Sequence, residues 1–492
     1  MTLLSRTTGY AFLIAFGVVM NILTIYYSKR IKDPHNTKSF LVANRKVNML
    51  LGAFSIAASW TWAPALLISS QTAFQQGLPG VFWFTAPNIL TLTLFAFLAV
   101  RIRNIAPYGY TLPEFIRSRF DAKTHIAYLF SFLSLQICAL AVQILAGAST
   151  IHWFTGISFV NAAVLITIIF SSYSLISGME ASIITDFVQM TMVIIICALI
   201  VPWVLIKAGG FASITGGLGG YSGKFTNIFD PSVAYSFGIP VAIGLLAGPI
   251  GDQQHWQRAF AIKKGILMKT HFLSGLVFGV VPVLLAFLGF IAANHSLNTG
   301  WNLSNAQLVG PVTVSHLLPT SATMLFVLMI LSGLASAGDS ALCAAVSLGA
   351  IDIHKTYINP NASDREIVFV SRLTMVIIAI LGLVIALIPN MKVLYLFLFY
   401  GTLRAATMLP TVLSLYWKSF SADACFLAVV LATLLGLPVF GYGSVMNNIH
   451  IQLLGSLLTV IIGFLLSVIV TQIRPDNFDY SRIATKGFGD FK

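Results

Sequence analysis

The chain of 492 residues contains thirteen apolar stretches of membrane-spanning length, and the linkers between them are alternately basic and almost uncharged. A helix of about 20 apolar residues crosses the hydrocarbon core of a bilayer. Only helices and closed barrels satisfy their backbone hydrogen bonds in lipid. The sequence therefore predicts an all-α integral membrane protein with about 13 transmembrane helices. We expect these helices at residues 8–28, 47–69, 80–100, 126–149, 157–176, 183–206, 234–251, 270–293, 320–350, 367–388, 393–416, 423–441 and 451–472.

The distribution of Lys and Arg predicts which side of the membrane each linker occupies. Of the 28 such residues, only Arg6, Lys207, Lys224 and Lys392 lie in the linkers of one side, and Arg404 lies inside a span. Basic linkers stay in the cytoplasm, so an odd number of spans places the N-terminus outside and the C-terminus in the cytoplasm. We expect a plasma membrane or a bacterial inner membrane. The linkers predicted to be cytoplasmic are 29–46, 101–123, 258–269, 355–372, the one at Lys418, and the tail after residue 472.

Composition excludes several classes of function. Hydrophobic residues make up 57% of the chain and charged residues 9%. The net charge of +13 is explained by linkers that meet anionic lipid headgroups, so we expect membrane lipids and no nucleic acid as partners. The four cysteines lie in apolar spans without paired spacing, which argues against a disulfide framework or a metal cluster. Motifs of hydrolases, zinc enzymes and nucleotide-binding proteins are absent, so we expect no enzyme.

Helix-breaking residues interrupt two of the predicted spans. Pro64 follows Ala58–Ala63 in the second span, and Gly244, Gly248, Pro249 and Gly251 lie in the seventh. Pro and Gly are common in membrane helices, but each interrupted span here would begin a half of five spans. Interrupted helices at matching positions in two halves predict a transporter with a binding site near the middle of the membrane.

We interpret residues 1–492 as one transmembrane domain, because no linker is long enough for a soluble domain. The first apolar stretch lacks a cleavage site and is followed by Lys29, Arg30 and Lys32, so we expect a span rather than a signal peptide. The predicted parts are an extra span with its linker (1–46), two halves (47–206 and 234–416) and extra spans with a short tail (417–492).

Four stretches resemble the sodium:solute symporter family: Ser39–Arg45 (SFLVANR), Ala57–Trp62 (AASWTW), Thr111–Phe120 (TLPEFIRSRF) and Ser177–Asp186. Within that family, SWTW followed by Leu66–Leu67 and Ser69–Ser70, together with His255–Ala259 (HWQRA), is similar to the urea-active transporter branch of fungi, plants and bacteria. The resemblance covers residues 35–420. It implies a LeuT-type fold, a five-plus-five inverted repeat with additional flanking helices, which works by alternating access.

The resemblance also implies an ion site between the interrupted second span and the ninth span. By motif position, carbonyl ligands for sodium would come from Ala58, Thr61 and Gly333, and side-chain oxygens from Ser336 and the next residue, with Asp186 nearby. That next residue is Ala337, so one hydroxyl ligand is missing. Sodium is therefore the implied ion, and proton coupling through a carboxylate is the alternative. Without the resemblance, residues 331–338 (LSGLASAG) would be interpreted as a small-residue face for helix packing.

Charged residues inside a membrane are costly, so each one is a candidate for function. Asp186 and Asp252 are expected near the inner ends of their spans, where an interfacial role competes with a coupling role. Asp339 and Arg404 lie mid-span. They are predicted either to pair with each other, or to act separately, with Arg404 binding a substrate carboxylate and Asp339 carrying a proton or contacting the cation.

Aromatic residues complete the candidate substrate site. Trp60 and Trp62 flank the predicted break and are expected, with Ser59, to line a pocket for a small solute. Trp256 is expected to anchor its helix at the membrane interface instead, because it lies beside Arg258.

We expect a secondary active transporter that couples sodium or a proton to the symport of a small polar organic solute. The alternatives are a solute sensor with a transporter fold, a channel, and proton-coupled uptake of urea or of a small carboxylate. A channel would need a polar stripe along several spans and would not need two matched breaks. The identity of the solute and the oligomeric state stay open.

Overall fold

The computed structural model describes residues 4–29, 36–299, 305–391 and 393–486. The regular secondary structure of these residues is helical, apart from one isolated parallel bridge between Val47 and Ile262. Four basic residues used in the charge argument lie outside the described residues, and these are Arg30, Lys32, Lys392 and Lys492.

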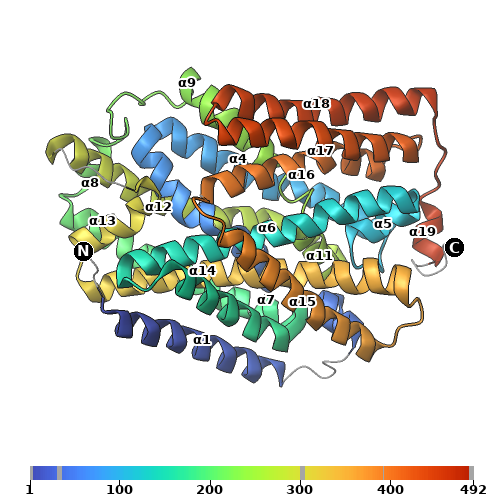
Figure 1. Ribbon diagram of the computed structural model, residues 1–492, viewed down its shortest axis with the longest axis horizontal. Helices are drawn as coiled ribbons and strands as arrows, with labels where there is room; N and C mark the ends of the chain where they lie inside the picture. Colours follow the sequence, from blue (N-terminus) through green and yellow to red (C-terminus); the bar gives the residue numbers. More distant parts are fainter. Residues whose placement is uncertain (1–3, 30–35, 300–304, 392, 487–492) are drawn as a thin grey trace.

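Eleven helical segments in the described part of the chain are long and apolar enough to cross a membrane. They run along the long axis of the molecule (Figure 1). One of them joins η2 (Pro64–Ile68) to α4 (Ser69–Ile105), and another joins α14 (Thr320–Ser347) to η6 (Leu348–Ile358). The helix α7 (Phe159–Lys207) counts as two spans because its backbone turns at Gly178, where φ is 55°. The others are α1 (Arg6–Ser28), α6 (Ala122–Thr155), α12 (Leu267–Thr299), α15 (Asp364–Ala386), α16 (Val393–Tyr416), α17 (Ala422–Val445) and α18 (Ile449–Ile473).

Each of the thirteen predicted spans has a helix at its position, but two of these helices are too short to span on their own. They are α3 (Met49–Trp60) and the segment Pro231–Leu246, which consists of α9 (Pro231–Val233), η3 (Ala234–Gly238) and α10 (Ile239–Leu246). Both belong to the spans in which the sequence predicted an interruption. The all-α membrane class is confirmed, with eleven candidate spans among the described residues, and the count of 13 transmembrane helices stays a prediction.

Shorter helices connect the spans at the two ends of the molecule. They are α2 (Thr37–Val42), η1 (Ala43–Arg45), α5 (Leu112–Arg119), α8 (Phe211–Thr215), α11 (Gln253–Ala261), η4 (Lys264–Ile266), η5 (Ala306–Leu308), α13 (Val309–Leu317) and α19 (Ser481–Lys486).

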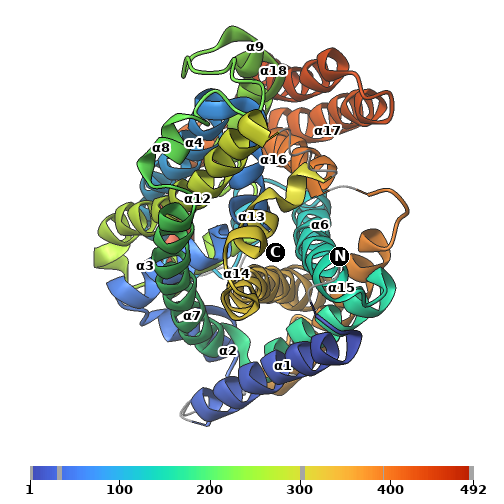
Figure 2. The same ribbon diagram turned by 90° about the vertical axis from the view of Figure 1, so that its left-hand side faces the viewer.

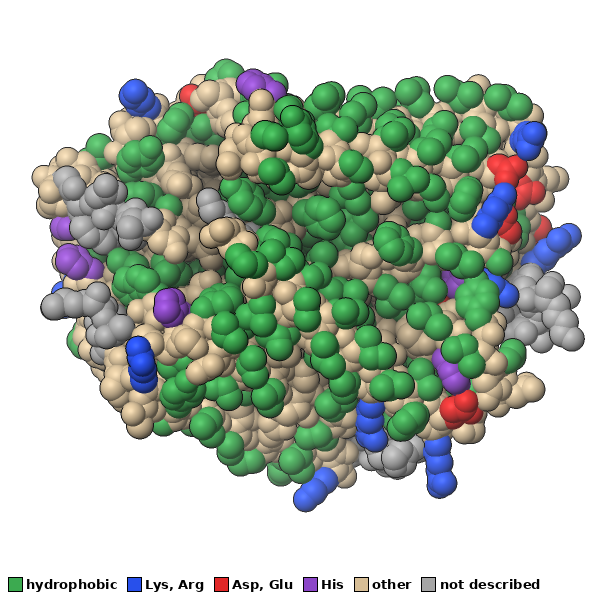
Figure 3. Space-filling view, in the orientation of Figure 1, with side chains coloured by type: hydrophobic (Ala, Val, Ile, Leu, Met, Phe, Trp, Pro, Cys, Tyr) green, Lys and Arg blue, Asp and Glu red, His purple; other side chains and the backbone are tan. Residues whose placement is uncertain are grey.

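The helices α6 and α14 form the centre of the molecule. In each span, 78% of the residues in an apolar stretch of 18 residues are buried inside the protein, compared with 33% in α1 and in α18. Figure 2 shows α1, α17 and α18 at the periphery. Apolar side chains cover the middle of the face seen in Figure 3, and charged side chains lie mainly towards its ends and lower edge. A belt of this kind is the surface that a lipid bilayer requires.

The linkers that the sequence predicted to be basic meet at one end of the molecule. Arg45 Nη1 donates to the carbonyl of Gly109 (2.8 Å), and Arg119 Nη2 donates to the carbonyl of Lys418 (2.9 Å). Thr37 Oγ1 donates to Asp364 Oδ1 (2.6 Å) at the start of α15. The chain termini lie at opposite ends of the long axis (Figure 1), as an odd number of crossings requires.

Candidate functional site

The first interruption separates α3 from η2 and leaves two residues, Thr61 and Trp62, outside the helices. Thr61 has φ −85° and ψ 62°, and Pro64 cannot donate a backbone hydrogen bond. The backbone N–H of Ala63 is satisfied from another helix, because it donates to Gln143 Oε1 of α6 (2.9 Å). The sequence prediction of a break between Ala58 and Pro64 is confirmed, and a membrane-buried Gln replaces the missing helical partner.

The second interruption separates α10 from α11 and packs directly against the first. Turns occupy residues 247–251, and the Asp252 side chain caps α11 by accepting from the backbone N–H of Gln254. A Cβ atom at Gly248 would lie 2.3 Å from the Trp60 ring, and one at Gly251 would lie 3.0 Å from the Arg404 Cα. The glycines therefore allow the two broken helices and α16 to approach one another closely.

Arg404 of α16 forms a buried ion pair with Asp252 at this junction. Asp252 Oδ2 also accepts from the Tyr400 hydroxyl (2.6 Å), and its Oδ1 accepts from Gln136 Nε2 of α6 (3.0 Å). The Arg404 guanidinium carbon lies 3.6 Å from the ring centroid of Tyr400, and also lies over the Trp60 and Trp62 rings. Because the carboxylate balances the guanidinium, this group carries no net charge.

A small cavity adjoins the ion pair and lies between the two breaks. The space between its lining atoms is about 220 Å³. The centre of a water molecule can occupy only about 10 Å³ of this space. That smaller volume corresponds to about one water. All of the lining residues are buried, so the cavity is closed at both ends. They are Ser59, Trp60, Trp62, Ala139, Gln143, Asp252, Gln254, Ala337, Tyr400 and Arg404.

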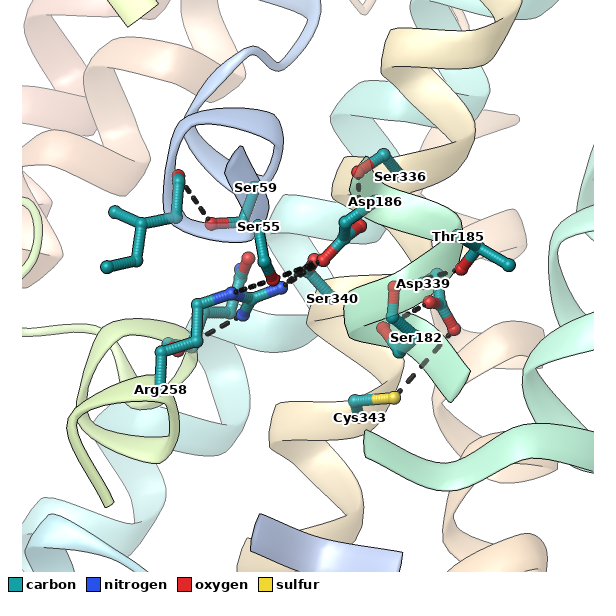
Figure 4. A network of polar contacts seen from close by, with 12 residues as sticks. Ser55, Ser59, Ser182, Thr185, Asp186, Arg258, Ser336, Asp339, Ser340 and Cys343 are labelled. Atoms are coloured by element: carbon teal, nitrogen blue, oxygen red, sulfur yellow. Dashed lines mark hydrogen bonds and ion pairs between the residues drawn. The ribbon is translucent and has the colours of Figure 1, made fainter. Parts of the chain in front are cut away.

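A second polar network lies between α3, α7, α11 and α14 (Figure 4). Arg258 Nη2 donates to Asp186 Oδ2 (2.8 Å) and to Ser340 Oγ (2.6 Å), and its Nε donates to Ser55 Oγ (2.9 Å). Ser336 Oγ donates to the other oxygen of Asp186 (2.5 Å). One guanidinium thus connects the first half of the broken second span with three other helices.

Asp339 lies beside this network but forms no ion pair with any described residue. Its Oδ2 accepts from Ser182 Oγ of α7 (2.5 Å), and its Oδ1 lies 3.8 Å from Cys343 Sγ one turn along α14. Asp339 is completely buried. Two carboxyl groups, Asp186 and Asp339, therefore lie near one buried guanidinium, but only Asp186 pairs with it (Figure 4).

The predicted pairing of Asp339 with Arg404 is wrong. Arg404 pairs with Asp252, whereas Asp339 faces α7 and does not line the cavity. Asp252 and Asp186 are both buried partners of an arginine, and their predicted position near the inner ends of their spans stays a prediction. Sequence spacing locates a charge along its own helix but gives no information about which neighbouring helix it faces.

Two further predictions near α11 are wrong for the same reason. Trp256 is completely buried, and its Nε1 donates to the carbonyl of Ile250 (2.8 Å), so it does not anchor the helix at the interface. Arg258 was counted among the basic linker residues but lies in the protein core. The sequence predicted that the chain leaves the membrane after the second break. It continues instead as the buried helix α11.

Sequence reasoning missed the glutamines that complete the site. Gln136 binds Asp252, and Gln143 replaces the lost helical hydrogen bond at Ala63. These two residues lie seven positions apart, or two turns, on the otherwise apolar α6. A pair of amides on one face of a membrane helix was the signal that could have identified them.

The comparison with protein families identifies the chain. The sequence profile of the Sodium:solute symporter family matches residues 40–432. The chain belongs to this family. It is a multi-pass membrane transporter and not an enzyme.

Relatives with assigned functions include urea transporters as well as transporters of proline and choline. A urea-proton symporter of Oryza sativa subsp. japonica is 26% identical, over 97% of this chain and 72% of its own length. The urea active transporter of Saccharomyces cerevisiae is 25% identical, over 98% of this chain and 71% of its own length. Among solved structures, a Na⁺-coupled sialic acid symporter in a substrate-bound, outward-open state has a TM-score of 0.79 at 17% identity, with 96% of this chain and 99% of that chain covered. This sodium:solute symporter therefore shares its fold with that protein.

The residues expected at the family's sodium site are close together in this symporter. A Cβ atom at Gly333 would lie 3.3 Å from the carbonyl oxygen of Thr61, so α14 touches the first break. The carbonyl of Ala58 accepts from the backbone N–H of Thr61 (3.0 Å). Ser336 donates its hydroxyl to Asp186, whereas Ala337 has no hydroxyl and lies against the central cavity.

Proposed function

We propose that this protein is a secondary active transporter that couples a proton to the symport of urea, or of a similarly small and neutral amide, by alternating access. The single observation that carries the coupling is the burial of a second carboxyl group, Asp339, beside an arginine, Arg258, that already pairs with Asp186. The substrate is inferred from the closed cavity beside the neutral Arg404–Asp252 pair and from the urea-transporting relatives.

The electrostatics of the cavity favour a neutral solute over a carboxylate. A substrate carboxylate at Arg404 would compete with Asp252, which already binds the guanidinium and is held by Tyr400 and Gln136. Displacing Asp252 would leave its charge buried without a partner, at a cost of several kcal/mol. The Arg404 ion pair is therefore compatible with a urea carrier, which does not need a net charge in its site.

The cavity also offers polar groups to a small amide. The Nε–H of Arg404 is buried and has no hydrogen-bond partner among the described residues. An unpaired buried donor is costly, and a carbonyl oxygen would satisfy it. The aromatic rings of Trp60, Trp62 and Tyr400 supply apolar walls for a planar molecule. The cavity holds about one water in this state, so its walls must move apart to admit a solute of a few heavy atoms.

The charge count at the second network favours a proton as the coupling ion. With Asp186 and Asp339 both ionised, the network around Arg258 carries one uncompensated negative charge in the protein core, which is unfavourable. A proton on Asp339 removes this charge without further ligands. Sodium would require several oxygen ligands, but Ala337 offers no hydroxyl, and the Ser336 hydroxyl already binds Asp186.

The same network connects proton binding to the broken helices. Ser55 lies on α3, Arg258 on α11, Asp186 and Ser182 on α7, and Asp339 on α14. A change in the charge of Asp339 alters the field at Arg258, which holds α3 and α11 together through Ser55. A proton on Asp339 then favours one arrangement of the two interrupted spans over the other. A coupled transporter requires such a difference, because a ligand shifts a conformational equilibrium only if it interacts differently with the two states.

Uptake of labelled urea into proteoliposomes tests the proposal. A pH gradient without sodium should drive urea accumulation, and a sodium gradient at equal pH should not. Asp339→Asn should abolish accumulation driven by the pH gradient, because the neutral amide cannot cycle a proton. Acetate should not compete with urea. Accumulation that needs sodium would contradict proton coupling, and strong competition by acetate would contradict the neutral substrate.

Substitutions at the two hydroxyl positions of the family's sodium site further distinguish sodium coupling from proton coupling. Ala337→Ser restores the second hydroxyl of the family's sodium site and is expected to introduce sodium stimulation of uptake. Ser336→Ala in the otherwise unchanged protein should leave uptake independent of sodium. If the unchanged protein depends on sodium and Ser336→Ala abolishes that dependence, sodium is the coupling ion.

A further inference from the structure

A third group of buried polar side chains lies near the end of the molecule that carries the C-terminus, where α5, α6 and η6 meet. His125 Nε2 contacts Asp352 Oδ1 (2.9 Å), and His125 Nδ1 contacts the hydroxyl of Tyr357 (2.7 Å). Asp352 and His125 are completely buried, whereas Tyr357 is 42% exposed. The group therefore extends from the protein core to the surface.

One oxygen of this group is left without a partner. Asp352 Oδ2 is buried and accepts no hydrogen bond of normal geometry from the described residues, although the Thr111 side chain lies near this carboxyl group. With Nε2–H donated to Asp352, the ring of a neutral His125 accepts the Tyr357 proton at Nδ1. A buried carboxylate oxygen without a donor is costly when ionised, and a proton bound there removes that cost.

Glu114 of α5 is the second carboxyl group of the cluster. Its Oε2 accepts from the backbone N–H of Tyr110 (2.8 Å), which closes a capping box with Thr111 at the start of α5. Burial, with a smaller effect from Asp352, raises the pKa of Glu114 to about 7. Glu114 thus changes charge near neutral pH.

Polar residues on one face of α14 connect this cluster with the coupling network. Asp339, Cys343 and Ser347 follow one another at intervals of one turn, and all are buried. Asp352 is five residues beyond Ser347 and would leave this face in an ordinary α-helix. The helix continues as the π-helical η6 from Leu348, whose wider turn brings Asp352 closer to the same face.

A glutamine joins the end of this polar face to α5. Gln253 Nε2 donates to Ser347 Oγ (3.1 Å) and to the carbonyl of Tyr110 (3.0 Å). Gln253 Oε1 accepts from the backbone N–H of Leu112 (3.1 Å) at the start of α5. Because Gln253 begins α11, the contact also links the cluster to the second broken span.

We propose that Asp352, His125 and Glu114 form a second proton-binding site, which receives the coupling proton from Asp339 along α14 and releases it at the end of the molecule near the C-terminus. This inference rests on the proton coupling proposed above. The proton leaves the Asp339 carboxyl group for water that enters along this face of α14, passes from that water to the unpartnered oxygen of Asp352, and then passes to solvent beside Tyr357 and Glu114. No bond other than O–H or N–H changes, and Asp339 regains its negative charge.

The neighbouring charges limit how this site responds to pH. Arg117 of α5 lies over the Tyr357 ring, with its guanidinium carbon 4.8 Å from the centroid. Lys355 of η6 favours the ionised form of Glu114. From α15, Glu366 faces His354 (2.7 Å) on the outer side of η6. From η1, Arg45 lies over the Tyr110 ring, with its guanidinium carbon 5.1 Å from the centroid. These cations favour loss of the proton once it has reached the cluster.

Two transport modes of the reconstituted protein test this site. Net urea uptake requires that the proton leave the carrier, whereas exchange of labelled for unlabelled urea at equal pH on both sides does not. Asp352→Asn and Glu114→Gln should lower net uptake driven by a pH gradient, and the proton entry reported by a pH-sensitive dye inside the vesicles, about tenfold or more. Exchange should stay within about twofold. The matched control is Glu366→Gln, an exposed carboxyl group at the same end, which should keep both modes.

The results separate this site from the proposed function. Loss of exchange and net uptake to the same degree, in variants that elute as monodisperse protein with unchanged melting temperature, would show a general role in transport and overturn the inference. Unchanged net uptake in both variants would also overturn it. Absence of urea-dependent proton entry in the unchanged protein would instead overturn proton coupling itself, whatever the variants do.

Discussion

At the scale of single residues, Arg404 shows how a charge is kept in the middle of a membrane protein. Its guanidinium is balanced by Asp252, covered by the Tyr400 ring and closed off from water by Trp60 and Trp62. Burial of both charges is expensive, and their attraction offsets this cost only while both are present. The pair is therefore a weak source of stability, but the loss of one partner is damaging.

This pairing predicts the outcome of a double-mutant cycle. Arg404→Gln and Asp252→Asn should each lower the free energy of unfolding by several kcal/mol, on the order of 3–5, because each leaves a buried charge alone. The double variant should be less destabilised than the sum of the two. Thermal melting of detergent-purified protein measures the coupling. The matched control combines Arg404→Gln with Asp339→Asn, and here the effects should add. Non-additive effects for Arg404 with Asp339, together with additive effects for Arg404 with Asp252, would show that Arg404 pairs with Asp339 after all.

At the scale of elements, short segments that cross between spans position the chemistry. The π-helical η6 lets α14 carry a polar face towards its end, and the eight-residue α5 brings Glu114 against that end. Neither element is long enough to span a membrane. Their role follows from the contacts of Gln253 and His125, which connect α5, α6, α11 and η6.

Burial of Glu114 in α5 predicts a specific dependence of stability on pH. The pKa of this group is about 7 in the folded protein, compared with 4.5 for the free side chain. Between these values the folded state holds a proton that the unfolded state has lost, so the free energy of unfolding falls as pH rises, by roughly 3 kcal/mol in total. Glu114→Gln removes this effect. The melting temperature of the variant minus that of the unchanged protein should therefore increase as the pH rises from 5 to 8.

A control for this pH effect is Glu366→Gln. Hydrogen bonds from Asn359 and His354 lower the pKa of Glu366, so this exposed group is ionised in both folded and unfolded protein above pH 6. Its melting temperature should differ from that of the unchanged protein by a constant amount between pH 6 and pH 8. A constant difference for Glu114→Gln as well would mean that Glu114 does not titrate in this range.

At the scale of the whole molecule, the arrangement of linkers is consistent with a defined orientation. The basic linkers contact one another at one end through Arg45, Arg119 and Thr37. The N-terminus lies at the opposite end of the long axis from the C-terminus (Figure 1). We propose that the basic end faces the cytoplasm, because Lys and Arg near span ends resist translocation.

Cysteine labelling tests this orientation in an otherwise unchanged protein. All four native cysteines are buried, so their background reaction should be small. Ser222→Cys, in the loop between α8 and α9, should react with a membrane-impermeant maleimide added to intact cells. Ser28→Cys, at the end of α1, should react only after the cells are opened. The reverse pattern would place the N-terminus in the cytoplasm.

The sequence by itself determined the membrane class, the positions of the spans, the two interruptions and the separation of basic from uncharged linkers. Each of these is a local property, because hydrocarbon excludes unpaired backbone groups and charges wherever they occur along the chain. The tertiary structure decided which charges meet. Arg404 pairs with Asp252 rather than Asp339, Arg258 leaves the linkers for the core, and Trp256 is buried instead of interfacial. These outcomes depend on how helices distant in sequence rotate and pack against one another, and the spacing of residues along a single helix contains no information about its neighbours.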